Sequence, residues 1–64
     1  MKRYIYEPKR STITDVITGK TVTMNGKDCY ELEKELVVAS TMNVTYMTNE
    51  GLRQDVLDRY FNKC

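Results

Sequence analysis

Two periodicities of apolar residues divide this chain of 64 residues into a front part and a back part. In the front part, Thr12–Ile17 is rich in β-branched residues and Thr21–Met24 alternates polar with apolar side chains, as half-buried strands do. In the back part, apolar residues recur every three or four positions, which is the period of an amphipathic helix. The pattern therefore predicts an α+β domain in which the strands come first.

Turn signals separate the predicted strands. A first β-prone segment, Lys2–Tyr6, ends before Pro8, because proline has no N–H to donate to a sheet. Gly19 lies between the next two strands and tolerates a positive φ, so these strands should form a hairpin. The apolar face of this hairpin would consist of Ile13, Val22 and Met24 with either Val16 or Ile17.

Helical spacing starts after the turn signal Asn25-Gly26. Asp28 and Glu31 have the spacing of a capping box, which predicts that a helix begins at Asp28. This helix would run to Leu36 or Val38 and would bury Cys29, Leu32 and Leu36.

A last helix is predicted over Glu50–Phe61, with Asn49 as its N-cap. Its buried stripe would consist of Leu52, Val56, Leu57, Tyr60 and Phe61.

The ten residues Ser40–Asn49 contain no charge and have two interpretations. Ser40 or Thr41 would cap a second helix, whereas the alternation over Asn43–Thr48 is also compatible with a strand. A short apolar connection after the first helix favours the second helix, and thus a helix-turn-helix. We expect one small domain over residues 1–64, β-rich over 1–25 and helical over 28–62. It would be a β-hairpin or three-stranded antiparallel sheet packed on two to three short helices.

Charge is distributed unevenly along the chain, although the net charge is only +1. Residues 1–27 hold six Lys and Arg against two acidic residues, whereas residues 28–64 hold four against seven. A basic front half would attract phosphates. Lys and Arg also protect exposed edge strands from aggregation, so both interpretations stay open.

The residue types present exclude several classes of site. The chain has no His and only two Cys, so we expect neither a metal site nor a cofactor. Cys29 is expected to be a small buried side chain, and a disulfide to Cys64 is not expected in a reducing compartment. No nucleophile is set beside a base and no Gly-rich phosphate loop occurs, which predicts a protein that is not an enzyme. No apolar run approaches the ~20 residues of a membrane span, which predicts a cytoplasmic protein without membrane association.

The order hairpin, turn, capped helix and Ser/Thr/Asn segment resembles the NUMOD-type DNA-binding repeats of phage and organellar homing endonucleases, over roughly residues 12–51. In that family a β-hairpin precedes a helix-turn-helix that reads DNA. Leu36, Val38 and Ala39 fit the pattern that follows its first helix, and Val37 stands where the family commonly has a glycine. The resemblance implies a small DNA-binding regulatory protein.

Two sets of residues would then contact nucleic acid. Phosphates would be contacted by Lys9, Arg10, Lys20 and Lys27. The major groove would be read by Ser40, Thr41, Asn43, Thr45 and Tyr46.

The alternative function is binding to a protein. In size and near-neutral charge the chain resembles, by type only, the small accessory proteins with which bacteriophages inhibit or modulate a host protein. Its five Tyr and four Met support an interface, and Tyr4, Tyr6 and Tyr46 would form the contact patch unless they pack on the sheet face. A homodimer would form through the edge strand near Tyr4–Tyr6 or through the stripe of the last helix. Basic residues on one surface around the polar segment would favour DNA, whereas an apolar-aromatic patch with a mixed-charge rim would favour protein.

Overall fold

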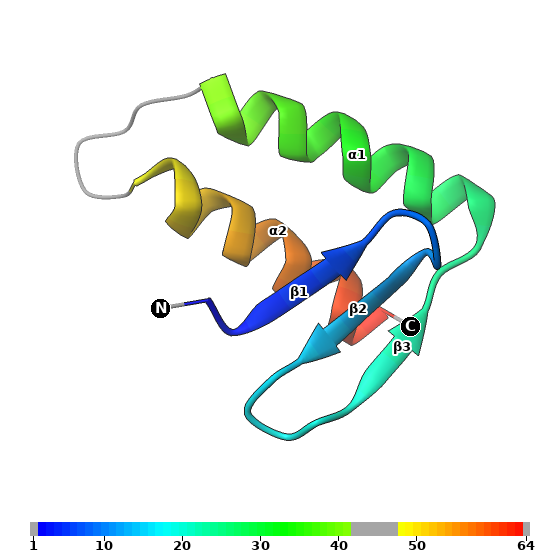
Figure 1. The fold of residues 1–64 in the computed structure, drawn as a ribbon. Coiled ribbons are helices and arrows are strands. Elements are labelled where there is room, and N and C mark those ends of the chain that lie inside the picture. Colours follow the sequence, from blue (N-terminus) through cyan, green and yellow to red (C-terminus); the bar gives the residue numbers. More distant parts are fainter. Residues whose placement is uncertain (1, 42–47, 64) are drawn as a thin grey trace.

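A computed structural model describes residues 2–41 and 48–63 of the chain. It contains a three-stranded antiparallel sheet followed by two helices that run antiparallel to each other on one side of it (Figure 1). The elements are β1 (Tyr4–Glu7), β2 (Thr12–Asp15), β3 (Thr21–Thr23), α1 (Gly26–Thr41) and α2 (Asn49–Lys63). The predicted α+β class is therefore confirmed, and of its two alternatives the three-stranded antiparallel sheet is the one observed.

The sheet is a meander in the order β1-β2-β3, so β1 and β3 are its edges. Tyr6 lies opposite Ile13, and Ile13 opposite Val22, so these three side chains point to the same face. Gly19 in the turn between β2 and β3 has a φ of 77°, which confirms the predicted hairpin turn.

The second strand ends at Asp15, two residues earlier than predicted. The Asp15 carboxylate accepts a hydrogen bond from the Ile17 N–H at 2.9 Å, and the Asp15 carbonyl accepts one from the Gly19 N–H at 2.7 Å. These bonds turn the chain out of the strand direction. Val16 and Ile17 are consequently exposed, and the prediction that one of them joins the core is wrong.

Both helices cover the inner face of the sheet, with α2 packed on β1 and β2 and α1 packed on α2. Ile13 and Leu32 are completely buried at the centre of this core. Burying one such side chain stabilises the fold by about 1.5–3 kcal/mol. The other buried members of the cluster are Tyr4, Val22, Met24, Leu36, Val56, Leu57, Tyr60 and Phe61.

The first helix begins at Gly26, so the predicted cap at Asp28 is wrong. Asn25 is the N-cap, because its Oδ1 accepts the Asp28 N–H at 2.7 Å and its carbonyl accepts the Cys29 N–H at 3.0 Å. Asp28 instead occupies the third helical position, where its negative charge is favoured by the helix dipole.

The first helix also continues past its predicted end, through Val37 and Val38 to Thr41. Ala39 extends the buried stripe of Leu36 at helical spacing, and no Gly or Pro interrupts the helix there. The turn expected near residues 37–39 is therefore helix, and the predicted helix-turn-helix is wrong in the described residues. Residues 42–47 of the ambiguous segment lie outside them.

The last helix spans Asn49–Lys63, slightly longer than predicted. Thr48, not Asn49, is its N-cap: the Thr48 Oγ1 accepts the Gly51 N–H, and its carbonyl accepts the Leu52 N–H, each at 3.0 Å. Of the predicted stripe, Val56, Leu57, Tyr60 and Phe61 are buried and Leu52 is half-buried.

Candidate functional site

Three of the predicted phosphate-contacting residues lie at one end of the molecule. Lys9 and Arg10 are in the turn between β1 and β2, and Lys27 is in the first turn of α1. The Met24 N–H donates to the Ser11 carbonyl at 2.8 Å, which holds the two segments side by side. All three cations are exposed, so this end has a cluster of positive charge, although Glu7 pairs with Arg10 at 3.6 Å and offsets part of it.

The remaining residues predicted to contact nucleic acid lie elsewhere. Lys20 is in the turn between β2 and β3, at the opposite end of the strands. Ser40 and Thr41 are in the last turn of α1, about 20 Å from Lys27 along the helix axis. The structure therefore does not bring the predicted phosphate-contacting and base-reading residues onto one surface. Asn43, Thr45 and Tyr46 lie outside the described residues.

Ser40 and Thr41 are also engaged within the chain. Their hydroxyls donate to the carbonyls of Leu36 and Val38 at 2.8 and 2.9 Å, respectively. Arg53 in α2 donates to the Ser40 Oγ at 2.9 Å. These bonds belong to a helix end and to the contact between the helices.

Two tyrosines predicted for a protein-binding patch pack inside the molecule. Tyr4 is buried, with its ring centroid 5.3 Å from that of Phe61 and its hydroxyl donating to Asp58. Tyr6 is half-buried, and its hydroxyl lies 3.0 Å from the Cys29 Sγ and donates to Glu33. The alternative of packing on the sheet face is therefore the one observed. Tyr46, the third member, is not among the described residues.

An exposed apolar patch lies instead on α1. Tyr30, Val37 and Val38 are exposed by 65%, 66% and 52%, respectively. They lie on the side of the helix turned away from the buried stripe of Leu32 and Leu36. The sequence could have predicted this patch from the four successive apolar residues Leu36–Ala39. A helix cannot bury four successive residues on one face, so some of them must be exposed.

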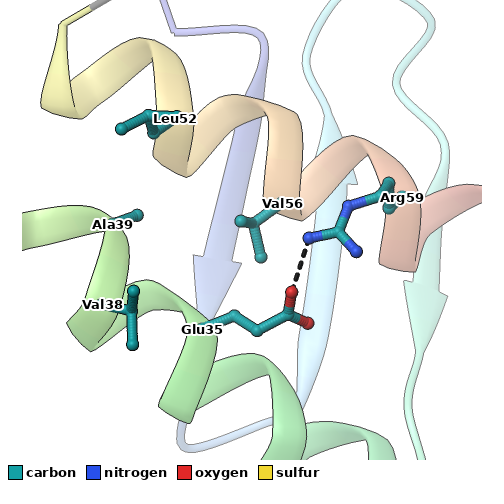
Figure 2. A pocket seen from close by; sticks show the side chains of 6 residues that line it. All are labelled: Glu35, Val38, Ala39, Leu52, Val56 and Arg59. Carbon is teal, nitrogen blue, oxygen red and sulfur yellow. Dashed lines mark hydrogen bonds and ion pairs between the residues drawn. The ribbon is translucent and has the colours of Figure 1, made fainter. Parts of the chain in front are cut away.

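A groove between α1 and α2 adjoins this patch at Val38 (Figure 2). Its volume is about 240 Å³, and every residue that lines it belongs to one of the two helices, so it opens on the helical side of the molecule. The lining residues are Glu35, Val38, Ala39, Leu52, Val56 and Arg59.

One charged pair crosses this groove. The Arg59 Nη2 donates to the Glu35 Oε1 at 2.5 Å, as the dashed line in Figure 2 marks. Hydrogen bonds from Tyr60 and Arg59 hold the pKa of Glu35 below its usual range. The hydrogen bond between the Tyr60 hydroxyl and Glu35, together with burial, raises the pKa of Tyr60 to about 12. At neutral pH the groove thus has apolar walls and is crossed by the ion pair of Glu35 with Arg59.

A second hollow, of about 270 Å³, shares Glu35 with the groove. Glu31, Lys34 and Tyr60 complete its lining. The Lys34 Nζ also lies 5.4 Å from the centre of the Tyr30 ring, so it belongs to the exposed patch as well. The patch and groove together therefore have apolar and aromatic centres with charges of both signs around them.

Both surfaces named for a homodimer are used within the chain, at least in part. The stripe of α2 is buried in the core. At the free edge of β1, the Gln54 side chain bonds both the N–H and the carbonyl of Tyr4, at 2.7 and 3.1 Å. A strand from a second copy would have to displace Gln54 to pair at this residue.

Metal sites and membrane-spanning helices were both considered from the sequence. Among residues 2–41 and 48–63, no group of three or more Cys, Asp or Glu side chains is placed to hold a metal ion. In the same residues, neither helix has the length and apolar character that crossing a membrane requires.

Sequence reasoning missed the buried carboxylate of Asp15, which is only 2% exposed. The Nε and Nη2 of Arg3 donate to its Oδ2 at 3.3 and 3.0 Å. Hydrogen bonds from Arg3 and from the Ile17 and Thr18 N–H groups hold the pKa of Asp15 below its usual range, although burial opposes them. Every strong contact of this carboxylate is internal, so we assign it to the fold rather than to the site.

No protein-family model, curated protein or solved structure matches the chain in the three comparisons made. The resemblance to NUMOD-type repeats consequently stays a prediction.

Proposed function

We propose that this protein is a non-enzymatic module that binds another protein through the exposed side of α1 and the adjoining groove. One observation carries the proposal: Tyr30, Val37 and Val38 form an exposed apolar-aromatic patch on a folded helix. Large apolar side chains gathered on a small domain are typical of an interaction surface. The charges around them, Lys34 and the Glu35–Arg59 pair, give the patch the mixed rim expected of a protein interface.

The exposed side of α1 faces away from the core, because the buried residues Leu32, Leu36 and Ala39 lie on the other side of this helix. A partner can therefore approach its exposed side without moving any strand. Both apolar walls of the groove, at Val38 and Leu52, are carried on helices, which favours a surface formed before binding.

Capture of partners by matched variants tests this proposal. The immobilised protein would be compared with Val37→Lys, in the patch, and with Val16→Lys, which adds the same charge at an exposed valine in the turn after β2. We expect one protein to be retained in stoichiometric amounts by the wild type and by Val16→Lys, and lost with Val37→Lys. Equal losses with both variants, or no retained protein, would contradict the proposal.

A second candidate function, binding of nucleic acid, is favoured by the cluster of Lys9, Arg10 and Lys27 at one end of the molecule. Such contacts would be to phosphates and would not read sequence. Fluorescence anisotropy of labelled duplex DNA at about 50 and about 200 mM salt tests this candidate. Binding that weakens steeply with salt and is reduced by Lys9→Ala would support it, and no binding at micromolar protein would exclude it.

A further inference from the structure

The exposed side of α1 has the spacing of a helix-pairing seam. Lys27, Tyr30, Lys34, Val37 and Thr41 follow one another at alternating steps of three and four residues, which places them on one stripe of the helix. All five are exposed, and the stripe lies opposite the buried residues Leu32, Leu36 and Ala39. We refer to these five residues as the α1 seam.

The only charges on the α1 seam are positive. Lys27 and Lys34 stand seven residues apart, or about 10 Å along the axis. Neither lysine forms an ion pair within the described residues; Lys34 only lies over the ring of Tyr30. A partner would therefore meet two unpaired ammonium groups on either side of an aromatic ring.

Helix α1 carries four acidic residues, and three of them are engaged with other parts of the chain. Asp28 accepts from Lys63 at 3.0 Å, Glu33 from the Tyr6 hydroxyl at 3.0 Å, and Glu35 from Arg59 at 2.5 Å. The fourth, Glu31, follows Lys27 by four residues and lines a hollow with Lys34, but within the described residues it forms no ion pair with either lysine. The α1 seam therefore keeps two unpaired positive charges. Its charge is thus complementary to carboxylates on a partner.

We propose that the α1 seam binds an acidic amphipathic helix of the partner protein, an inference that rests on the proposed function. Apolar side chains of that helix would pack on Tyr30 and Val37, and its carboxylates, spaced by two helical turns, would pair with Lys27 and Lys34. A second copy of this chain is a poorer occupant, because self-pairing would bring four lysines into one narrow interface.

A synthetic peptide probes this inference directly. It would be a helix of about three heptads with leucines along one side and glutamates beside them at seven-residue spacing. Fluorescence anisotropy of the labelled peptide would measure its affinity for the full chain. We expect Lys34→Glu to weaken binding by about tenfold or more. Lys20→Glu makes the same charge change in the β2–β3 turn, away from the α1 seam, and should change the affinity by less than about twofold.

A charge swap provides the stronger test. A peptide with lysines in place of the glutamates should fail to bind the wild type and should bind the double variant Lys27→Glu, Lys34→Glu. The inference is overturned if both peptides bind the wild type equally, if Lys20→Glu weakens binding as much as Lys34→Glu, or if the acidic peptide does not bind. Sedimentation showing a dimer that Val37→Glu dissociates would overturn it too, by assigning the seam to a second copy.

Failure of this inference can be told apart from failure of the proposed function. If the acidic peptide does not bind but a protein is still captured and lost with Val37→Lys, the module binds protein by other chemistry. If neither occurs, the proposed function fails as well.

Discussion

The side-chain amide of Gln54 forms hydrogen bonds with both backbone polar groups of Tyr4, fifty residues earlier in the chain. Its Oε1 accepts the Tyr4 N–H at 2.7 Å and the Arg3 N–H at 3.0 Å, and its Nε2 donates to the Tyr4 carbonyl at 3.1 Å. These are the bonds that a neighbouring strand would make. Gln54 therefore occupies part of the β1 edge and fastens α2 to it.

Replacement of Gln54 by alanine should destabilise the fold by about 1–3 kcal/mol, because the partly buried polar groups of Tyr4 lose their partner. Urea unfolding followed by circular dichroism measures this change. The control is Asp55→Ala, an exposed neighbour on the same helix, which should stay within about 0.5 kcal/mol of the wild type. Equal effects of the two substitutions would contradict a specific role for the Gln54 amide.

The two sides of α1 should respond differently to the same kind of truncation. Leu32 is completely buried, so Leu32→Ala should lower the free energy of unfolding by about 2–5 kcal/mol. A domain of this size has only about 3–10 kcal/mol of stability, so much of the variant protein would be unfolded. Val37→Ala removes an exposed side chain and should change the free energy of unfolding by less than about 0.5 kcal/mol.

Thermal unfolding of the two variants side by side checks this contrast. It also controls the binding experiments, since Val37 variants must stay folded for a loss of binding to be informative. A large destabilisation by Val37→Ala would show that Val37 packs inside the molecule and would remove the basis of the exposed patch.

Much of the fold follows from local patterns in the sequence. The alternation at Ile13 and Val22, the turn at Gly19 and the helical spacing of Leu32 and Leu36 all appear in the structure as predicted. Each of these signals depends on neighbours a few residues away, or on which face of one element is apolar. Such signals are present before any tertiary contact is known.

Errors arose where two local signals competed. The capping-box spacing of Asp28 with Glu31 suggested a helix start that Asn25 in fact provides. In the same way, the polar residues from Ser40 onward suggested a new helix, although Ser40 and Thr41 bond back to the preceding turn and extend α1. The sequence contains several acceptable caps, and packing of the helix on its neighbours decides among them.

The candidate site was the least predictable part. Which tyrosines are exposed depends on contacts across the chain: Tyr4 meets Phe61 and Gln54, whereas Tyr30 faces away from α2. The groove requires the relative placement of two helices, which no local pattern specifies.

Substitution of the observed cap tests the corrected start of α1. Asn25→Ala should cost about 1 kcal/mol, because the Asp28 N–H loses its acceptor, whereas Asn25→Ser should be nearly neutral. Urea unfolding at neutral pH measures both. If the serine variant loses as much stability as the alanine variant, the contribution of Asn25 is not that of a cap.

Tyr60 should make the protein less stable in alkali. Its pKa is raised from 10.0 to about 12, first by the hydrogen bond to Glu35 and then by burial. This contribution is fully present below pH 10, the value for the unfolded chain, and is lost as the pH rises toward 12.

Urea unfolding between pH 9 and 11.5, with phenolate absorbance recorded in parallel, measures this loss. We expect Tyr60→Phe to reduce the fall in stability with pH, without abolishing it, because the pKa values of Tyr4 and Tyr6 are raised as well. Glu35→Gln should lower the pH at which Tyr60 ionises. If the free energy of unfolding of Tyr60→Phe falls with pH as steeply as that of the wild type, Tyr60 is not the group responsible for the loss.

Acid should act on the fold through Asp15. Because the hydrogen bond from Arg3 lowers its pKa below the ordinary value of 3.8, its contribution to stability is fully present above about pH 4 and is lost as the pH falls further. Asp15→Asn should therefore be less stable than the wild type at pH 7 and should lose less on acidification. Some acid dependence will remain, since the pKa of Glu35 is also lowered.

Unfolding of the wild type, Asp15→Asn, Arg3→Ala and the double variant, each measured at pH 7 and at about pH 2.5, completes this test. At pH 7 the double variant should lose less stability than the two single variants lose together, because Arg3 and Asp15 form one hydrogen-bonded pair at 3.0 Å. At the lower pH the coupling should shrink, since protonation removes the charge that Arg3 contacts. Additive effects at both pH values would show that the two residues stabilise the fold independently.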